Sequence, residues 1–322
     1  RLLGIGLPLT MISGFALAIP LYPGISWWLL AIMAFILSPT DAALGQAVVA
    51  SDTVPEKVRD TIGVESGLND GIALPPIMAC IAAFMATAGP ELGSGHWIWF
   101  GVRQLTLGPI AGIAVGLAGG WMIEQAVRRG WMEPVFQRLS SIALALIAYA
   151  LADRIGGNGF ISAFCAGLFL AARSKTVRAR IQEFGEAEGQ QLSLFVFLMF
   201  GMVLVPVAHA YWNWTALVYA LLSLTVIRMV PVALSLIGTK LDLTTMAFIG
   251  WFGPRGIASV LYLMILVGEL GSKANRQILS VIVLTVLLSV FIHGLSAVPL
   301  SNAYGRYAAH SRKPDGPAEK TG

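Results

Sequence analysis

The chain has 322 residues, of which 57% are hydrophobic and 12% are charged, with a formal net charge of +4. Soluble domains carry roughly 25% charged residues, so this composition excludes an ordinary water-soluble domain and favours a membrane protein. A hydrocarbon core about 30 Å thick requires about 20 apolar residues per spanning helix, and runs of that length are the first pattern to find.

Ten apolar runs follow one another along the chain, and they predict an all-α, polytopic transmembrane bundle. They lie at Leu2–Tyr22, Ile25–Ala50, Gly63–Thr87, Leu105–Val127, Ile142–Ile155, Phe160–Ala172, Leu192–Ala210, Trp214–Ile237, Leu243–Val267 and Ile278–Leu300. Only the weak break at 153–158 separates the fifth and sixth runs. We predict two helices there.

The basic residues support this count, because cytoplasmic loops of membrane proteins carry an excess of Lys and Arg. Alternate loops differ strongly. One set contains Lys57, Arg59, Arg128, Arg129, Arg138, Arg173, Lys175, Arg178, Arg180, Lys240, Arg306, Arg312, Lys313 and Lys320, and the other contains Arg103, Arg154, Lys273 and Arg276. We therefore expect the loop around Lys57 and the C-terminus to be cytoplasmic, in a multi-pass protein of the cell membrane. The positive charge reflects these loops and gives no reason to expect a nucleic-acid partner.

The remaining composition indicates one transmembrane domain over residues 1–302 and a disordered cytoplasmic tail over 303–322, which is polar and contains Pro314 and Pro317. Cys80 and Cys165 lie in apolar runs without metal-type spacing, so we expect them to fill space in the core. No signal peptide is visible, and the chain begins with Arg1 at the edge of an apolar run, which suggests that upstream helices are absent.

Two runs contain helix-breaking residues together with a charge. The second reads FILSPTDAALG and places Pro39, Thr40 and Asp41 in an apolar run, and the ninth reads FIGWFGPRGIASV and places Pro254 and Arg255 in another. Interrupted helices, one in each half of a chain, form the midplane site of inverted-repeat transporters. Ordinary proline kinks are the alternative.

The third run reads GVESGLNDGIALPPIM and contains Glu65, Ser66, Asn69 and Asp70. On a helix, Ser66 shares a face with Asp70, and Glu65 shares a face with Asn69, because each pair is four residues apart. An acid inside the membrane faces a cavity or a partner. Both acids could instead serve only as structural ion pairs with Arg228 and Arg255.

Apart from Glu124, Asp153 and Arg154 near the ends of two runs, the apolar runs contain three carboxylates, Asp41, Glu65 and Asp70, and two cations, Arg228 and Arg255. If both arginines are paired, one carboxylate remains for an exchangeable ion. Carboxylate, hydroxyl and carbonyl oxygens are hard ligands that suit a hard monovalent cation. Na⁺ is the leading candidate, and K⁺ or Li⁺ stays open.

The ordered set SPTDAALGQAV, ESGLNDG, GGNGFISAFCAGL, VIRMVPVAL, GWFGPRGIAS and FIHGLSAVPL resembles the monovalent cation:proton antiporters, in the sodium/proton exchanger branch with an Asn-Asp motif in the ion-binding helix. The resemblance runs from the first span to His293. It implies a thirteen-helix fold with two interrupted, crossing helices, and hence about three N-terminal helices missing here, and a homodimer at full length. It also implies electroneutral exchange, and no cofactor beyond the transported cation.

The resemblance further implies roles for individual residues. Asp70 would bind the cation or proton, Ser66 and the Thr40 backbone would add oxygens, and Asp41 would lie at the crossing. Asn69 and Glu65 would form a support network, with Arg228 as the partner of Glu65 and Arg255 close to the crossing. Relatives commonly have Pro after the Thr-Asp pair, where this chain has Ala42 and places Pro39 earlier instead.

The expected mechanism is competition at one site. Removal from water disfavours an ionised carboxylate, so Asp70 holds either a proton or a cation, and a site that reorients only when occupied couples the two gradients. A membrane enzyme is disfavoured because His96, His209, His293 and His310 lie outside the spans or near helix ends. A cation channel or a transporter-like sensor with the same fold is the alternative.

Overall fold

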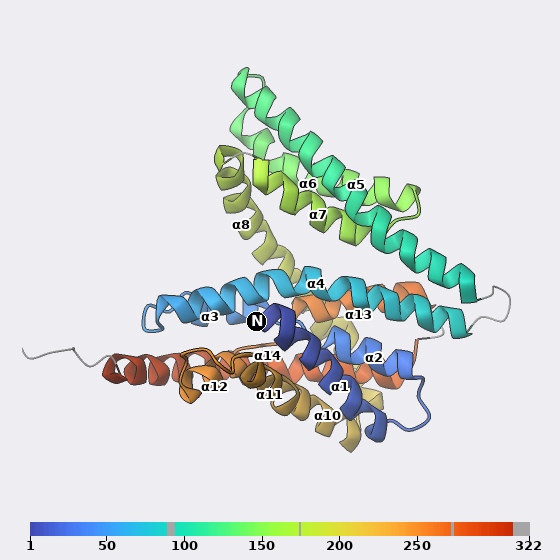
Figure 1. Cartoon of the computed structure of the whole chain (residues 1–322), viewed down its shortest axis with the longest axis vertical. Coiled ribbons are helices and arrows are strands. Elements are labelled where there is room, and N and C mark those ends of the chain that lie inside the picture. The colour runs from blue at the N-terminus through green and yellow to red at the C-terminus, as the bar shows by residue number, and fades with distance from the viewer. Residues whose placement is uncertain (89–93, 174, 272–273, 312–322) are drawn as a thin grey trace, which may run out of the picture.

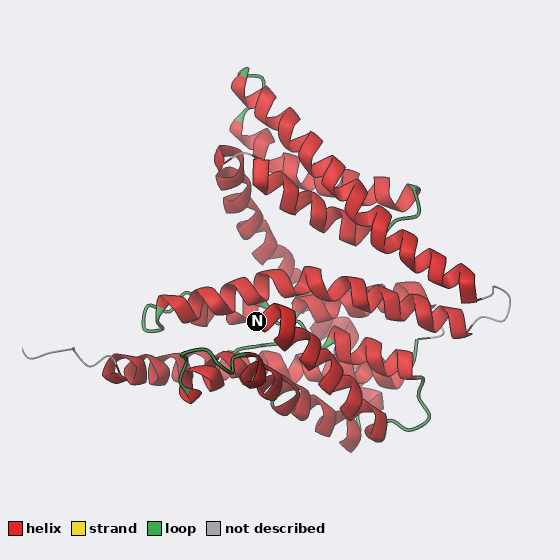
Figure 2. Cartoon of the chain, viewed as in Figure 1, coloured by secondary structure: helices red, strands yellow, loops and turns green. Residues whose placement is uncertain are grey.

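The computed structural model describes residues 1–88, 94–173, 175–271 and 274–311, and these residues form helices and loops without a β-strand (Figure 1). Figure 2 shows that loops are confined to short connections. The helices, including π-helical η1 and η2 and 3-10 helical η3, are η1 Leu2–Gly6, α1 Leu7–Leu21, α2 Trp27–Ile36, α3 Ala42–Val49, α4 Glu56–Ala88, α5 Ser94–Arg128, α6 Pro134–Arg154, α7 Gly159–Arg173, α8 Lys175–Met199, η2 Phe200–Leu204, α9 Val205–Ala208, η3 His209–Tyr211, α10 Trp214–Leu224, α11 Val226–Ser235, α12 Leu243–Trp251, α13 Ile257–Leu270 and α14 Arg276–Ser311.

The all-α polytopic prediction is confirmed, and every predicted run is helical. Seven helical stretches of the described residues are long and apolar enough to cross a membrane. The other three runs are α7, which is short, and the pairs α2–α3 and α12–α13, each of which is broken in the middle. The predicted division between the fifth and sixth runs is correct, because α6 ends at Arg154 and α7 begins at Gly159.

Helix ends differ from the predicted ones because apolar runs detect only the part of a helix that contacts lipid. Helix α4 begins at Glu56 and α8 at Lys175, both well before the apolar sequence. The expected disordered tail from residue 303 is wrong in its first part, because α14 continues to Ser311. The Tyr304 ring stacks on Phe248, and its hydroxyl forms a hydrogen bond with the Thr245 hydroxyl at 2.8 Å. These contacts hold the extension in place. Residues 312–322 lie outside the described part.

The spans form two groups (Figure 1). Helices α5 to α8 make one group, and the other combines a first triplet (α1, α2–α3, α4) with a second triplet (α10–α11, α12–α13, α14). Each triplet has its broken span in the middle and a long helix at the end. The second triplet begins seven spans after the first, an odd number, so the two triplets cross the membrane in opposite directions. This is the predicted inverted repeat.

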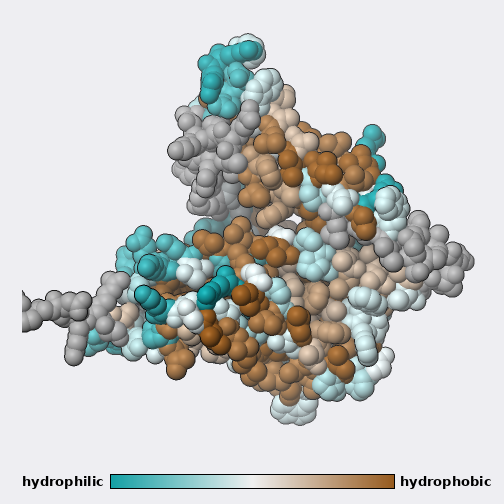
Figure 3. Space-filling model, in the orientation of Figure 1, coloured by the Kyte–Doolittle hydropathy of each residue, from teal (hydrophilic) through white to brown (hydrophobic). Residues whose placement is uncertain are grey.

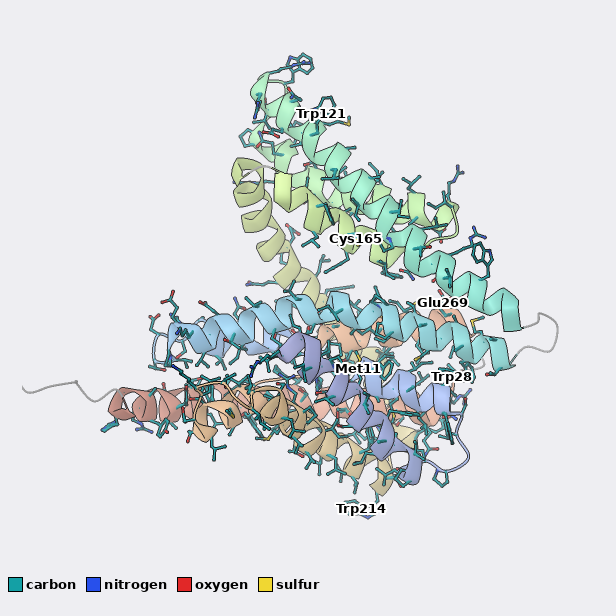
Figure 4. All side chains as sticks on the ribbon, in the orientation of Figure 1. Met11, Trp28, Trp121, Cys165, Trp214 and Glu269 are labelled. Atoms are coloured by element: carbon teal, nitrogen blue, oxygen red, sulfur yellow. The ribbon has the colours of Figure 1, made fainter. Side chains whose placement is uncertain are left out.

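Glycines let α5 approach α7 closely. Gly108, Gly112 and Gly116 are four residues apart on α5, and a Cβ at Gly116 would lie 2.5 Å from the carbonyl oxygen of Ala166. At Gly112 a Cβ would overlap the carbonyl oxygen of Ser162. Small residues at this spacing are typical of helix pairs in membranes. Cys165, labelled on α7 in Figure 4, fills part of the same contact, as predicted for a structural cysteine.

The exterior matches a lipid environment. Figure 3 shows apolar residues across the middle of the visible face and hydrophilic residues toward its ends. Trp28 and Glu269 lie at the end where α1 joins α2 (Figure 4). The Ser51–Pro55 connection lies at the opposite end, beside the end of α14 (Figure 1), where the Thr53 hydroxyl contacts the Ser301 carbonyl oxygen at 3.5 Å. The connection before Lys57 and the end of α14 therefore share one side.

Candidate functional site

The broken helices meet in the middle of the two triplets. Helix α2 ends at Ile36 and α3 begins at Ala42, while α12 ends at Trp251 and α13 begins at Ile257. The two unwound segments lie against each other, because the Asp41 amide donates to the Pro254 carbonyl oxygen at 2.7 Å. Interrupted crossing helices, rather than proline kinks, are confirmed.

Charged side chains satisfy the broken ends across this crossing. The Asp41 carboxylate accepts from the Ile257 amide at 2.6 Å and so caps the N-terminus of α13. Arg255 Nη1 donates to the carbonyl oxygens of Ser38 and of Pro39, the latter at 3.0 Å, beyond the C-terminus of α2. Each charge has the sign that stabilises its helix end. Asp41 and Arg255 thus lie at the crossing, where the resemblance placed them.

Glycines make this close approach possible. A Cβ at Gly256 would overlap the Asp41 carboxylate, and a Cβ at Gly253 would lie 2.5 Å from Arg228 Nε and 2.9 Å from Thr40 Cγ2. The GPRG sequence therefore provides room for the charged groups as well as the break in the helix.

The polar face of α4 contacts the unwound segment of the first broken helix. Ser66 Oγ lies 3.0 Å from Thr40 Oγ1, and Asn69 Nδ2 donates to the same Thr40 oxygen at 2.6 Å. All three side chains are buried. Asn69 thus fixes the Thr40 side chain, which agrees with a supporting position.

Glu65 of α4 is paired with a residue of the second triplet. Its Oε1 lies 2.6 Å from Arg228 Nη2 on α11, and the two side chains are 3% and 1% exposed. The structure therefore selects Arg228 as the partner of Glu65. Arg255 instead contacts backbone carbonyls.

Asp70 differs from the other two carboxylates of the spans. It is partly exposed, and its Oδ1 is buried without a hydrogen-bond partner. Its backbone carbonyl accepts from the Tyr262 hydroxyl at 2.6 Å, which fixes α13 against α4. Glu65 is paired and Asp41 caps α13, whereas Asp70 has a buried carboxylate oxygen without a hydrogen-bond partner in the described part of the chain.

A cavity of about 590 Å³ reaches Asp70. Asp41 and Ser66 line it with Asp70, and so do Gln46 and Val49 of α3 and Gly185, Gly189 and Ser193 of α8. The α3 residues of the lining precede the Ser51–Pro55 connection, and the α4 residues follow it. The cavity therefore opens toward the end of the molecule that holds the Lys/Arg-rich loops.

The other side of Asp70 is closed by packing. Met33 and Ile36 of α2, Ile77 and Ile81 of α4 and Leu266 of α13 are buried in one apolar cluster. The Asp70 carboxylate is thus accessible from one side in this conformation.

Sequence reasoning did not find three residues of this region. Tyr262 contacts the Asp70 backbone, Ser259 donates to the Ile36 carbonyl oxygen at 2.8 Å, and Ser289 accepts from the Arg255 amide at 2.6 Å. The only signal in the sequence was a hydroxyl inside an apolar run. Gly185, Gly189 and Ser193 form a small-residue series at four-residue spacing, which was a second such signal.

The family model described as "Sodium/hydrogen exchanger, transmembrane" matches residues 1–303. The chain belongs to this family. The exchanger family comprises transporters, and the chain is a multi-pass membrane protein of that class.

Similar proteins include a K(+)/H(+) antiporter NhaP2 of Shewanella oneidensis, which is 25% identical over 81% of this chain and 45% of its own length. A Na(+)/H(+) antiporter of Schizosaccharomyces pombe is 25% identical over 88% of this chain and 66% of its own length. This exchanger-family chain thus spans about half to two thirds of these relatives.

A solved structure has the same fold, the sodium proton antiporter MjNhaP1 from Methanocaldococcus jannaschii. It superposes with a TM-score of 0.71 over 94% of this chain and 77% of its own, at 18% sequence identity. Because the superposition covers 94% of the chain, the shared fold includes both triplets and α5–α8.

Proposed function

We propose that the protein exchanges a monovalent cation for protons across the membrane and that Asp70 binds both in turn. The observation that carries the proposal is the state of the Asp70 carboxylate, which has an unpartnered buried oxygen and lies in a cavity open to one side. The named activities of the relatives, sodium/proton and potassium/proton antiport, agree with it.

Competition at Asp70 follows from solvation. An ionised carboxylate in the membrane is unfavourable until a cation or a proton neutralises it. The Ser66 hydroxyl, on the same face of α4 and in the same cavity, would add an oxygen ligand to a dehydrated cation, as would the Thr40 backbone. Asp41 completes the proposed site through its place in the cavity lining.

Coupling requires that the site open alternately. The cavity on the Ser51 side and the apolar packing on the other side correspond to one of the two conformations. We assign the open side to the cytoplasm, because its loops are rich in Lys and Arg. The C-terminus is then cytoplasmic as well, in a cell membrane.

Na⁺ is the expected substrate, K⁺ and Li⁺ fit the same oxygens, and no cofactor is needed beyond the carried ion. A homodimer of the full-length protein is expected, with lipid around it and no role for nucleic acid.

The test is Asp70→Asn in the longest natural polypeptide that contains this chain, reconstituted into vesicles with a pH-sensitive dye inside. Asn keeps the size and hydrogen bonding of Asp but removes the charge. Proton flux driven by a Na⁺, K⁺ or Li⁺ gradient should be abolished, while the protein still folds. Cation addition should raise the melting temperature of the parent and not of the variant, since a ligand stabilises only a state that it binds.

The matched control is Asp153→Asn, an exposed acid at the end of α6, which should exchange like the parent. Flux in Asp70→Asn equal to that of the control would reject Asp70 and make Asp41 the next candidate. Cation flux in the parent that needs no counter-movement of protons would instead indicate a channel.

A further inference from the structure

A second cavity lies on the outside of the bundle, where η2, α9 and η3 pass over α13 and α14. It has a volume of about 410 Å³, and Leu204, Val207, Leu263, Val267 and Val283 contribute to its walls. None of its lining residues lines the cavity of Asp70. The π-helical turn at η2 and the proline of α9 make the local backbone irregular, which leaves a groove between these elements and the second triplet.

The interior of this groove is apolar. Its lining contains two hydroxyl groups, those of Tyr211 and Ser280. The Ser280 hydroxyl donates to the Ala208 carbonyl oxygen at 3.0 Å. Val207 is 68% exposed and Val267 is 42% exposed, so the groove is accessible from the lipid. A dry, apolar groove open to the bilayer suits a hydrocarbon chain and offers nothing to a hydrated ion.

A positively charged side chain, that of Arg276, lies at one end of the groove. Arg276 begins α14 and Tyr211 ends η3, so both lie where helices leave the membrane. Arg276 Nη1 donates to the Tyr211 hydroxyl at 2.8 Å, and the guanidinium lies 6.0 Å from the ring centroid. Within the described part of the chain, no carboxylate forms an ion pair with Arg276. Its other N–H donors and the hydroxyl proton of Tyr211 remain available.

We propose that this groove binds an anionic phospholipid, with one acyl chain along the apolar walls and the phosphate group accepting hydrogen bonds from Arg276 and Tyr211. Arginine and tyrosine at the interface match the charge and the depth of a lipid headgroup. The lipid connects η2–α9–η3 to α13, the half-helix whose Tyr262 contacts the Asp70 backbone. The site is independent of the proposed exchange, since it needs no ion at Asp70.

The test compares melting temperatures of the purified protein with phosphatidylglycerol or phosphatidylcholine of identical acyl chains, in detergent. Phosphatidylglycerol should stabilise the parent at lower concentration. Arg276→Gln should weaken the apparent affinity for phosphatidylglycerol about fivefold, the effect of one basic residue near an anionic surface. Val207→Trp, which fills the groove from its exposed edge, should abolish the preference for phosphatidylglycerol over phosphatidylcholine.

Arg154→Gln is the matched control, an exposed arginine in the last turn of α6 on the same side of the membrane, and it should bind like the parent. Glycerol 3-phosphate, the headgroup without chains, should not stabilise any variant. Equal stabilisation by both lipids, or an unchanged preference in Arg276→Gln, would overturn the proposal. Stabilisation by glycerol 3-phosphate would replace the lipid by a free phosphate.

Discussion

The ion pair of Glu65 and Arg228 indicates which role Glu65 has in the protein. Both side chains are buried, and Gly253 leaves room for Arg228 beside Thr40. A buried pair contributes little relative to apolar residues, but removal of one partner leaves a charge without compensation in a medium of low dielectric constant. We therefore expect Glu65 to act mainly on folding.

Glu65→Gln should lower the free energy of unfolding by roughly 3 to 5 kcal/mol, because Arg228 stays charged and loses its partner. Thermal melting in detergent measures this loss. Glu124→Gln is the control: Glu124 pairs with Arg128 at 2.7 Å on the exposed part of α5, and its removal should cost at most about 0.5 kcal/mol. Replacement of both partners, Glu65→Gln with Arg228→Met, should recover stability. An unchanged melting temperature together with altered cation preference would make Glu65 a direct ligand.

At the scale of helices, the breaks were predictable and their contacts were not. Pro39 and the GPRG sequence identify both interruptions, because a proline beside a charged residue in an apolar run frees backbone groups that must be satisfied at membrane depth. The cluster of polar residues in the third run likewise indicates Asp70 and Ser66 as candidate ligands. Sequence spacing left Arg228 and Arg255 equivalent as partners of Glu65, because the choice depends on which broken ends face each other in space. Only the resemblance favoured Arg228, which is the partner in the structure.

The π-helical turn at Phe200–Leu204 and the one-residue irregularity of the eighth span at Thr225 were not predicted. Neither contains a charge or a proline at the irregular position, so apolar periodicity continues through both. Tertiary packing, which a hydropathy pattern does not contain, decides these local geometries.

The crossing itself can be tested at Gly256. Gly256→Ala places a methyl group on the Asp41 carboxylate, and the cap of α13 must move. Overpacking of this kind costs typically about 1 to 3 kcal/mol, so the melting temperature should fall and exchange should slow with it. Gly268→Ala, on the same α13 with open space around it, should be neutral. Equal behaviour of the two variants would show that the crossing is not tightly packed.

At the scale of the whole molecule, the connection at Thr53 and the end of α14 are in contact, while the α1–α2 turn is at the other end. The structure relates these ends to each other, and the distribution of Lys and Arg adds the prediction that the first is cytoplasmic.

Single cysteines test this orientation in a background that lacks Cys80 and Cys165. With an impermeant maleimide, Pro23→Cys should be labelled in intact cells, whereas Asp52→Cys and His310→Cys should react only after permeabilisation. All three positions are exposed. Labelling of Asp52→Cys but not Pro23→Cys in intact cells would invert the topology.

The charges at the crossing also determine how the proposed exchange depends on the membrane potential. Asp41 and Arg255 sum to zero, as do Glu65 and Arg228, so Asp70 alone gives the empty site its net charge. Occupied by one proton or one monovalent cation, the whole group is neutral. Movement of one elementary charge through 100 mV corresponds to about 2.3 kcal/mol, and a neutral group is exempt from it. A rate of exchange that changes when a potential is imposed on the vesicles would reveal a further moving charge. Without one, the membrane potential acts only on the empty form, and the two ion gradients alone set the direction of the proposed exchange.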